Sequence, residues 1–261
     1  MRALHTAATG MIAQELNVQV ISNNIANMNT TGYKRQRAEF QDLLYQNQRR
    51  VGAASSDQGT IVPVGVQIGI GTKAAAVYRI TEQGNLLKTD NTLDVAIQGK
   101  GFFQIKQPDG TTAYTRAGSF QLSNTGEIVT ADGLVVNPGL TIPADTVTVS
   151  INASGQVLAQ ISGQTQTSTV GQLELANFPN EAGLQNIGSN LLIETAASGS
   201  PVQGAPSSVG FGSLQQGFLE TSNVNVVSEI TNLITAQRAY EMNSKVIQVS
   251  DQMSSSLNSF R

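Results

Sequence analysis

The feature that most constrains this chain is a seven-residue repeat of apolar side chains near its N-terminus. One row of the repeat contains Leu4, Met11, Val18 and Ile25, and a second row contains Ala7, Ile21 and Met28, with Gln14 as its polar member. Such rows form one stripe of a helix that packs along another helix. The sequence therefore predicts an amphipathic helix over residues 3–28. It should stop at 30–32, where Gly32 can take the left-handed conformation of a helix end.

A second amphipathic helix is predicted from about Asn225 to the end of the sequence. Asn225 is a suitable N-cap, and no Gly or Pro follows it. Its apolar positions are Val226, Ile230, Leu233, Ile234, Tyr240, Ile247, Val249, Met253, Leu257 and Phe260. At ~1.5 Å per residue this helix would be a rod of roughly 54 Å.

Between the two helices the sequence alternates as β-strands do. The segments TLDVAIQGKGFFQI (92–105) and TVTVSIN (146–152) are rich in β-branched or aromatic residues, which favour strands. Turn signals with hairpin spacing occur at 108–110, 124–126, 131–133 and 152–155. We therefore expect an antiparallel β domain that is large enough to have its own core.

The predicted fold class is α+β, with paired N- and C-terminal coiled-coil helices, a central antiparallel all-β domain and an extended hairpin-like arm. The arm is expected because TIVPVGVQIGIG (60–71) alternates with glycines after a polar, Gly/Ser-rich stretch. The predicted domains are 1–32 with 222–261 (helical), 33–75 (linker and arm) and 76–221 (β).

The N-terminal helix carries almost no charge. Within residues 3–28, Glu15 is the only formally charged side chain and His5 is titratable. An isolated surface helix usually has a charged outer face, whereas uncharged amides are buried against other backbones at lower cost. The pattern favours neighbours on several sides, which many copies of the chain can supply; a helical pair packed on the β domain of the same chain is the alternative. Copies joined by a contact that does not close into a ring form a helical polymer.

The composition argues against several classes of function. The net charge of −3 gives no electrostatic reason to expect nucleic acid, and the absence of cysteine excludes disulfides and thiolate metal sites. No segment approaches the ~20 consecutive apolar residues of a membrane span. The N-terminus lacks the pattern of a cleaved signal peptide, so we expect a cytosolic protein or one exported by another route.

No catalytic, cofactor-binding or metal-binding residue is predicted. A metal site at His5 and phosphate binding at GKG (99–101) or GIGTK (69–73) are weaker interpretations than a helix residue and β turns. Asp90, Asp94 and Asp109 flank turns and give no sign of sharing a cleft. The basic residues Lys34, Arg35, Arg37, Arg49 and Arg50 are expected to contact acidic groups of neighbouring subunits.

Three separated motifs resemble those of one family. SNNIANMNTTGYKR (22–35) is similar to the N-terminal signature of the bacterial flagellar rod and hook proteins. TLDVAIQGKGFFQI (92–105) and SNVNVVSEITNLITAQRAYEMNSKVIQ (222–248) resemble its central and C-terminal motifs. The resemblance is collinear over the whole chain. YQNQRRVGAASSDQGTIVPVG (45–65) resembles the segment that distinguishes the distal rod from the hook.

The resemblance implies a structural subunit of a rigid helical tube in the flagellar basal body, spanning the periplasm. Its implied partners are other copies of itself, the proximal rod proteins, the hook protein, the surrounding bushing ring and the flagellar type III export apparatus. No cofactor, nucleic acid or membrane insertion is implied. A proximal rod or hook subunit is the alternative within the family. A wall-degrading enzyme and a β-rich adhesin or carbohydrate-binding protein are the alternatives in other classes.

We expect the contacts between subunits on the helices and the arm. The expected helical positions are Leu4, Met11, Val18, Ile21, Asn23, Asn24, Ile25, Asn27, Met28, Gly32, Tyr33, Val226, Ile230, Leu233, Tyr240 and Ile247. The expected arm positions are Arg49, Arg50, Asp57, Gly59 and Pro63.

Overall fold

The computed structural model describes residues 2–49, 64–163 and 166–259. The chain forms two compact units, which we call the helical unit (1–25, 36–78 and 225–261) and the β unit (26–35 and 79–224). Each unit therefore combines segments that are far apart in the sequence. The fold is α+β, as the sequence predicts.

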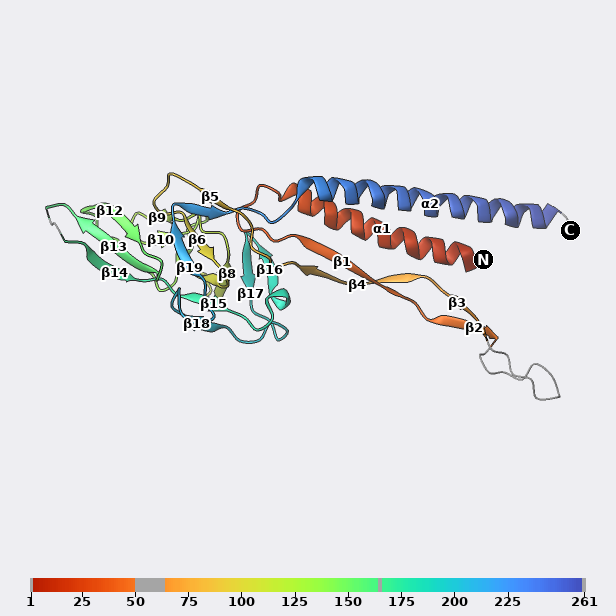
Figure 1. Cartoon of the computed structure of the whole chain (residues 1–261), viewed down its shortest axis with the longest axis horizontal. Helices are drawn as coiled ribbons and strands as arrows, with labels where there is room; N and C mark the ends of the chain where they lie inside the picture. The colour runs from red at the N-terminus through yellow and green to blue at the C-terminus, as the bar shows by residue number, and fades with distance from the viewer. Residues whose placement is uncertain (1, 50–63, 164–165, 260–261) are drawn as a thin grey trace. The chain divides into compact units, whose positions relative to one another are not determined.

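The helical unit contains the two long helices, α1 (Arg2–Ala26) and α2 (Val226–Ser259). They run antiparallel and side by side (Figure 1). The Asn24 amide donates to the Glu229 carboxylate at 3.2 Å, and a Cβ added at Gly10 would lie 2.9 Å from the Asn243 side chain. Gly10 and Asn24 are two heptads apart on α1, as are Asn243 and Glu229 on α2, so one register holds along both helices.

The helix ends follow the local sequence. Ser228 N donates to Asn225 Oδ1 at 3.2 Å, which confirms Asn225 as the N-cap of α2. α1 ends at Ala26, somewhat before the expected stop, because residues 27–32 form turns. There the Asn27 side chain accepts a hydrogen bond from Thr30 Oγ1, and such local bonds compete with the helix. Gly32 lies at the end of these turns with a φ of +68°.

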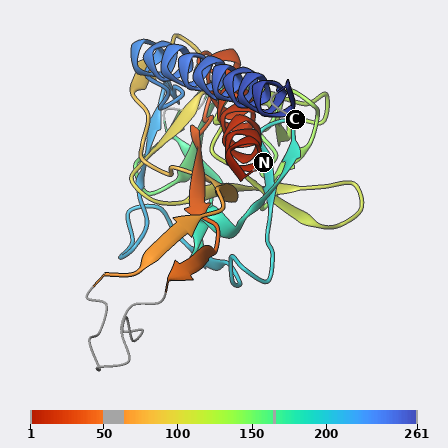
Figure 2. The ribbon, with the colours of Figure 1, turned by 90° about the vertical axis from the view of Figure 1, so that its right-hand side faces the viewer.

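Four strands complete the helical unit. β1 (Gln36–Asp42) pairs with β4 (Thr72–Arg79), and β2 (Tyr45–Arg49) pairs antiparallel with β3 (Val66–Gly69). Figures 1 and 2 show α1 between α2 and these strands. Thr9 in α1 fixes this contact, since its hydroxyl accepts from Thr72 N at 3.3 Å. The expected arm positions Arg50, Asp57, Gly59 and Pro63 lie outside the described residues.

The described part of the β unit is built from antiparallel pairs of short strands. Its elements are β5 (Leu86–Lys88), β6 (Val95–Gln98), β7 (Phe102–Lys106), β8 (Thr112–Thr115), β9 (Gln121–Leu122), β10 (Ile128–Val129), β11 (Val135–Val136), β12 (Thr146–Ile151), β13 (Gln156–Ile161), β14 (Ser168–Gln172), β15 (Leu175–Asn177), a 3-10 helix (Glu181–Gly183), β16 (Gln185–Gly188), β17 (Leu191–Ile193), β18 (Val202–Gly204), β19 (Ser213–Gln216) and β20 (Phe218–Glu220). The largest sheet follows the order β16-β17-β8-β7-β11-β10-β9, with β15 also on β7 and β18 on β15. Smaller sheets are β12-β13-β14, β19-β6 and β20-β5.

Four predicted turns are confirmed by their glycines. Gly110, Gly126, Gly133 and Gly155 have φ angles between +80° and +87°, and each lies between consecutive strands. This left-handed backbone is open to glycine at little cost. The turns therefore define the hairpins β7-β8, β9-β10, β10-β11 and β12-β13.

The core of the β unit follows the alternation of β7. Phe103 and Ile105 are fully buried in the main cluster, where the Phe103 and Phe120 rings meet edge to face at 5.0 Å. Phe102 points to the other face and belongs to a smaller cluster with Tyr114 and Phe178. Both faces of β7 are thus buried, which explains its continuous run of large side chains.

We predict that alanine at Gly126 destabilises the chain more than alanine at Gly133. Both glycines have a φ of +80°, so each substitution incurs about 1–2 kcal/mol of left-handed strain. A Cβ at Gly126 would also lie 2.5 Å from the Ile142 carbonyl oxygen, whereas one at Gly133 meets nothing within 4 Å. Urea unfolding followed by circular dichroism should show about 1–3 kcal/mol of additional loss for Gly126→Ala. Equal losses would contradict the packing described here.

Candidate functional site

The α1 positions predicted to contact other subunits differ in how far the structure buries them. Ile21 and Asn24 are buried, whereas Met28 is 38% exposed. The remaining heptad residues Leu4, Met11, Val18 and Ile25 are half-buried. The apolar stripe of α1 is therefore partly covered within a single chain.

Asn24 has a role within the chain, where the sequence predicted one between subunits. Its amide nitrogen donates to Gln36 O at 2.8 Å and to Glu229 at 3.2 Å, and its oxygen accepts from Gln36 N at 2.8 Å. The side chain pairs with the backbone at the start of β1 as a neighbouring strand would. It is 1% exposed, and the partners named here all lie in its own chain.

The residues of α2 nearest α1 are small or polar. Glu229, Ala236 and Ser250 are buried, and Asn243 lies against Gly10. These four residues are seven apart, so they form a single row, which we call the inner row. Sequence reasoning missed this row because it followed the large apolar residues. The seven-residue spacing of the small and polar residues was the signal that could have found it.

The large apolar side chains of α2 mostly face outward. Among the predicted positions, Ile230 and Tyr240 are 45% and 44% exposed, while Val226, Leu233 and Ile247 are half-buried. Further exposed apolar residues on α2 are Val227, Ile234, Met242, Val246, Val249 and Met253. Among the residues that the structure describes, nothing covers this apolar surface of α2, because the inner row is the face used against α1.

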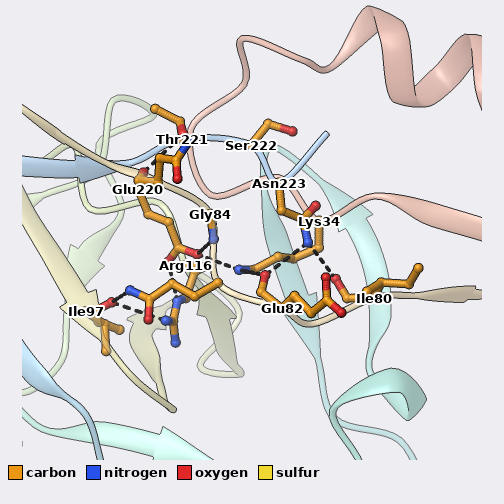
Figure 3. A network of polar contacts seen from close by, with 12 residues as sticks. Lys34, Ile80, Glu82, Gly84, Ile97, Arg116, Glu220, Thr221, Ser222 and Asn223 are labelled. Carbon is orange, nitrogen blue, oxygen red and sulfur yellow. Dashed lines mark hydrogen bonds and ion pairs between the residues drawn. The ribbon is translucent and has the colours of Figure 1, made fainter. Parts of the chain in front are cut away.

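A buried ionic cluster centres on Glu220, the last residue of β20 (Figure 3). The Glu220 carboxylate is fully buried and accepts from Lys34 Nζ at 2.5 Å, from Arg116 Nε at 2.6 Å and from Gly84 N at 2.9 Å. Its backbone oxygen also accepts from Gly32 N at 2.8 Å. One residue therefore joins three segments of the β unit that are distant in sequence.

The two cations of this cluster are also bonded to backbone carbonyls. Arg116 donates to Gly99 O and Gly101 O, both at 2.5 Å, and so holds the GKG turn from inside. Lys34 donates to Glu82 O at 2.8 Å. Buried charges are tolerated when they are paired and hydrogen-bonded in this way.

Burial and ionic pairing oppose each other at these groups. Burial raises the pKa of Glu220, but the nearby Arg116 and Lys34 outweigh it, so the pKa lies below the ordinary value of 4.5. Burial lowers the pKa of Lys34, and attraction to Glu220 only partly offsets this. At neutral pH the carboxylate is therefore ionised.

Two of the basic residues expected to contact neighbouring subunits pair with acidic groups of their own chain. Lys34 pairs with Glu220, and Arg35 lies 3.6 Å from Glu82 in the same chain. The acidic partners come from distant parts of the sequence, which the local clustering of basic residues could not reveal. Arg37 is half-buried, Arg49 is exposed in β2, and Arg50 lies outside the described residues.

The described residues contain no group of three or more His, Asp or Glu side chains placed to bind a metal. His5 Nδ1 lies 3.4 Å from Ile70 O. Asp94 accepts from the Asn91 amide, and Asp109 accepts from Thr111 within a turn, which lowers the pKa of Asp109. Each of the two aspartates is thus held by residues next to it in the sequence. No described helix is both long and apolar enough to cross a membrane.

We predict that Glu220→Gln destabilises the chain by about 3 kcal/mol or more, because it leaves two buried cations without a counter-charge. Glu82→Gln is the matched control. Its side chain is 73% exposed and its ion pair is long, so the loss should stay below about 1 kcal/mol. Urea midpoints of the two full-length variants make the comparison. Similar midpoints would show that the cluster contributes no more than a surface pair.

The same cluster predicts a specific pH dependence. Because the pKa of Glu220 is lowered on folding, its contribution is present above pH 4.5 and is lost as the pH falls through the folded value. The wild-type chain should therefore lose more stability between pH 5 and 3 than Glu220→Gln, which cannot take up this proton. Urea unfolding at steps of pH measures the difference. Parallel curves for the two proteins would contradict the assignment.

Comparisons with known proteins match three separate regions of the chain. Residues 4–34 match the family "Flagella basal body rod protein", residues 96–159 match the "Flagellar hook protein FlgE/F/G D1 domain", and residues 215–260 match the "Flagellar basal body rod FlgEFG protein C-terminal". These regions overlap the three motifs on which the resemblance was based, and they include residues 22–34, 96–105 and 222–248 of them. The resemblance to flagellar rod and hook proteins is thus confirmed.

Full-length relatives give the same result. The flagellar basal-body rod protein FlgG of Caulobacter vibrioides is 62% identical over 253 residues, which cover 97% of both chains. FlgG of Borreliella burgdorferi is 49% identical and FlgG of Bacillus subtilis 40% identical, each over 97% of this chain and 96% of the relative. The chain belongs to the FlgG family of flagellar basal-body rod proteins.

Proposed function

We propose that this chain is a structural subunit of the distal rod of the flagellar basal body. In this proposal many copies assemble into a straight, rigid helical tube. The tube transmits torque from the motor to the hook, and its central channel serves for export. The chain carries out no chemical reaction in this role.

The observation that carries the proposal is the outward position of the large apolar side chains of α2. Ile230, Ile234, Met242 and Val249 are each at least 45% exposed. Burying one such side chain stabilises a contact by roughly 1.5–3 kcal/mol. Copies of the chain that cover this surface for one another would gain several such contributions. If the contact does not close into a ring, it produces a helical filament.

The helical unit is the expected wall of the tube. The antiparallel contact of α1 and α2, with its seven-residue inner row, supports a coiled-coil pair that lines the channel. Tight packing of many such pairs would resist shear, because moving one helix breaks many contacts together. The linker and arm at 33–75 would reach adjacent subunits, and the β unit would form the outer face.

The further partners follow from membership of the rod family. They are the proximal rod proteins, the hook protein, the ring that surrounds the rod as a bushing, and the flagellar type III export apparatus. The location in this proposal is the basal body across the periplasm.

A proximal rod or hook subunit is the alternative within the family. The three full-length relatives are all rod proteins by name, which favours the rod. An adhesin or carbohydrate-binding protein is not favoured, because the matched families include both helical ends. Electron microscopy of the polymer separates the rod from the hook: a straight, stiff tube supports the distal rod, and a curved one supports the hook.

We predict that Ile234→Asn weakens polymerisation. Removing one buried apolar side chain from a repeated contact should raise the critical concentration about tenfold or more. Gln237→Asn, at another exposed α2 position, is the matched control and should leave it within about twofold. Pelleting of the assembled protein gives the critical concentrations. Circular dichroism of the dilute protein checks that the helices are equally formed.

Two outcomes would count against the proposal. Equal critical concentrations for both variants would show that the exposed face of α2 is not used in assembly. A wild-type chain that forms no filament at any concentration or salt would contradict the proposed function itself.

A further inference from the structure

We propose that four outward residues of α2 dock into a groove between α1 and β4 of a second copy of this chain. The four residues are Met242, Val246, Val249 and Met253, which we call the outer row. The inference rests on the proposed function, since it names the two surfaces that meet when copies assemble. The inference also pairs Lys245, which borders the outer row, with Glu15, which lies at the rim of the groove.

The groove lies within the helical unit, and it has a volume of about 450 Å³. Its α1 wall contains Thr9, Ile12, Ala13, Glu15, Leu16 and Gln19, and its β4 wall contains Thr72, Lys73 and Ala74. Ile12 is 68% exposed there, which is high for a large apolar side chain on a helix that packs on two sides. The groove is therefore a mainly apolar surface that no described residue of the single chain occupies.

The outer row has the spacing of a helix that binds in a groove. Its members are separated by four, three and four positions, so they lie on one face over three turns. They are 47% to 63% exposed. Methionine at both ends of the row can adapt to an irregular wall. The row is the longer of the two exposed apolar runs on α2, since Val227, Ile230 and Ile234 cover only two turns.

The two surfaces also match in length. The α1 wall runs from Thr9 to Gln19, which is ~15 Å of helix, and the outer row from Met242 to Met253 is ~17 Å of helix. A shorter row would leave part of the groove open to water. The length therefore favours the outer row over the first exposed run.

The occupant must come from another copy. Met242 and Val249 each precede an inner-row residue by one position, which turns them ~100° away from the face that α2 presents to its own α1. Because Asn243 lies against Gly10 in this chain, the outer row cannot face the same α1 at the same time. A second chain can bring its outer row to the groove without disturbing this pair.

The groove and the outer row also carry opposite charges at their borders. Glu15 is the only carboxylate of α1, and it belongs to no ion pair among the described residues. The only basic residues of α2 are Arg238 and Lys245, seven apart, on one border of the outer row. Lys245 lies between Met242 and Val246, so a docked outer row would bring it to the rim that carries Glu15. A pair at such a rim selects the orientation of docking more than it adds affinity.

Charge reversal tests the pair in the full-length chain. Glu15→Lys and Lys245→Glu should each raise the critical concentration about three- to tenfold at low salt. An equimolar mixture of the two variants should assemble near the wild-type concentration, since each groove then meets the opposite charge on the other chain. The double variant should also recover. These results would support docking between chains.

The other outcomes overturn the inference. If either single variant assembles as well as the wild type, the pair does not form. Recovery in the double variant but not in the mixture would place the pair inside one chain. If the single variants lose assembly and neither the mixture nor the double variant recovers it, different surfaces meet. In all three cases a wild-type tube leaves the proposed function intact.

A second measurement does not require assembled tubes. It uses single introduced cysteines, which are the only ones present because the chain has no cysteine of its own. Chains with Ile12→Cys and Val246→Cys are mixed and oxidised, and the inference expects a disulfide-linked pair of the two different chains. Val227→Cys is the matched control and should not link to Ile12→Cys, although Val227 is more exposed than Val246, at 76% against 47%. Absence of the expected pair, or equal linking in the control, overturns the docking whatever the filament does.

Discussion

The β unit depends on one buried carboxylate. Glu220 stands at the end of the last strand, yet it accepts from Lys34 in the segment that follows α1 and from Arg116 near the centre of the unit. The first and last segments of the unit are therefore joined at the Glu220 carboxylate. In a medium of low polarity such a cluster is stable only when every charge has its partner. The burial of this charge thus imposes a single arrangement on segments that no local interaction would bring together.

The helical unit is organised differently. Its inner contact is made by small and polar residues such as Ala236 and Asn243, which let the two helices approach closely, while the large apolar side chains of α2 remain outside. A chain designed to be stable as a monomer would reverse this distribution. In the proposed rod, neighbouring copies would cover this apolar surface. The surface would then be the means of assembly.

The combination suits a part that bears load. In the proposed rod, the β unit would keep its form through an internal core and the Glu220 cluster, and the helical unit would gain its final stability from other copies. Cohesion would then reside in repeated apolar contacts, and orientation in a few rim charges such as Glu15 and Lys245. Apolar contacts supply most of the association energy, whereas opposite charges reject misaligned neighbours.

The sequence by itself determined the elements. The heptad rows predicted the first helix, the amphipathic pattern that follows Asn225 predicted the second, and glycines such as Gly126 and Gly133 predicted the hairpin turns. Each of these depends on residues within a few positions of one another. Only the tertiary structure decided which charges and amides meet. Lys34 and Glu220 are joined across 186 positions, and Asn24 and Glu229 across 205. No periodicity carries that information. The tertiary structure also decided which face of α2 is turned inward, since the side that packs is set by the shape of the partner surface as well as by hydrophobicity.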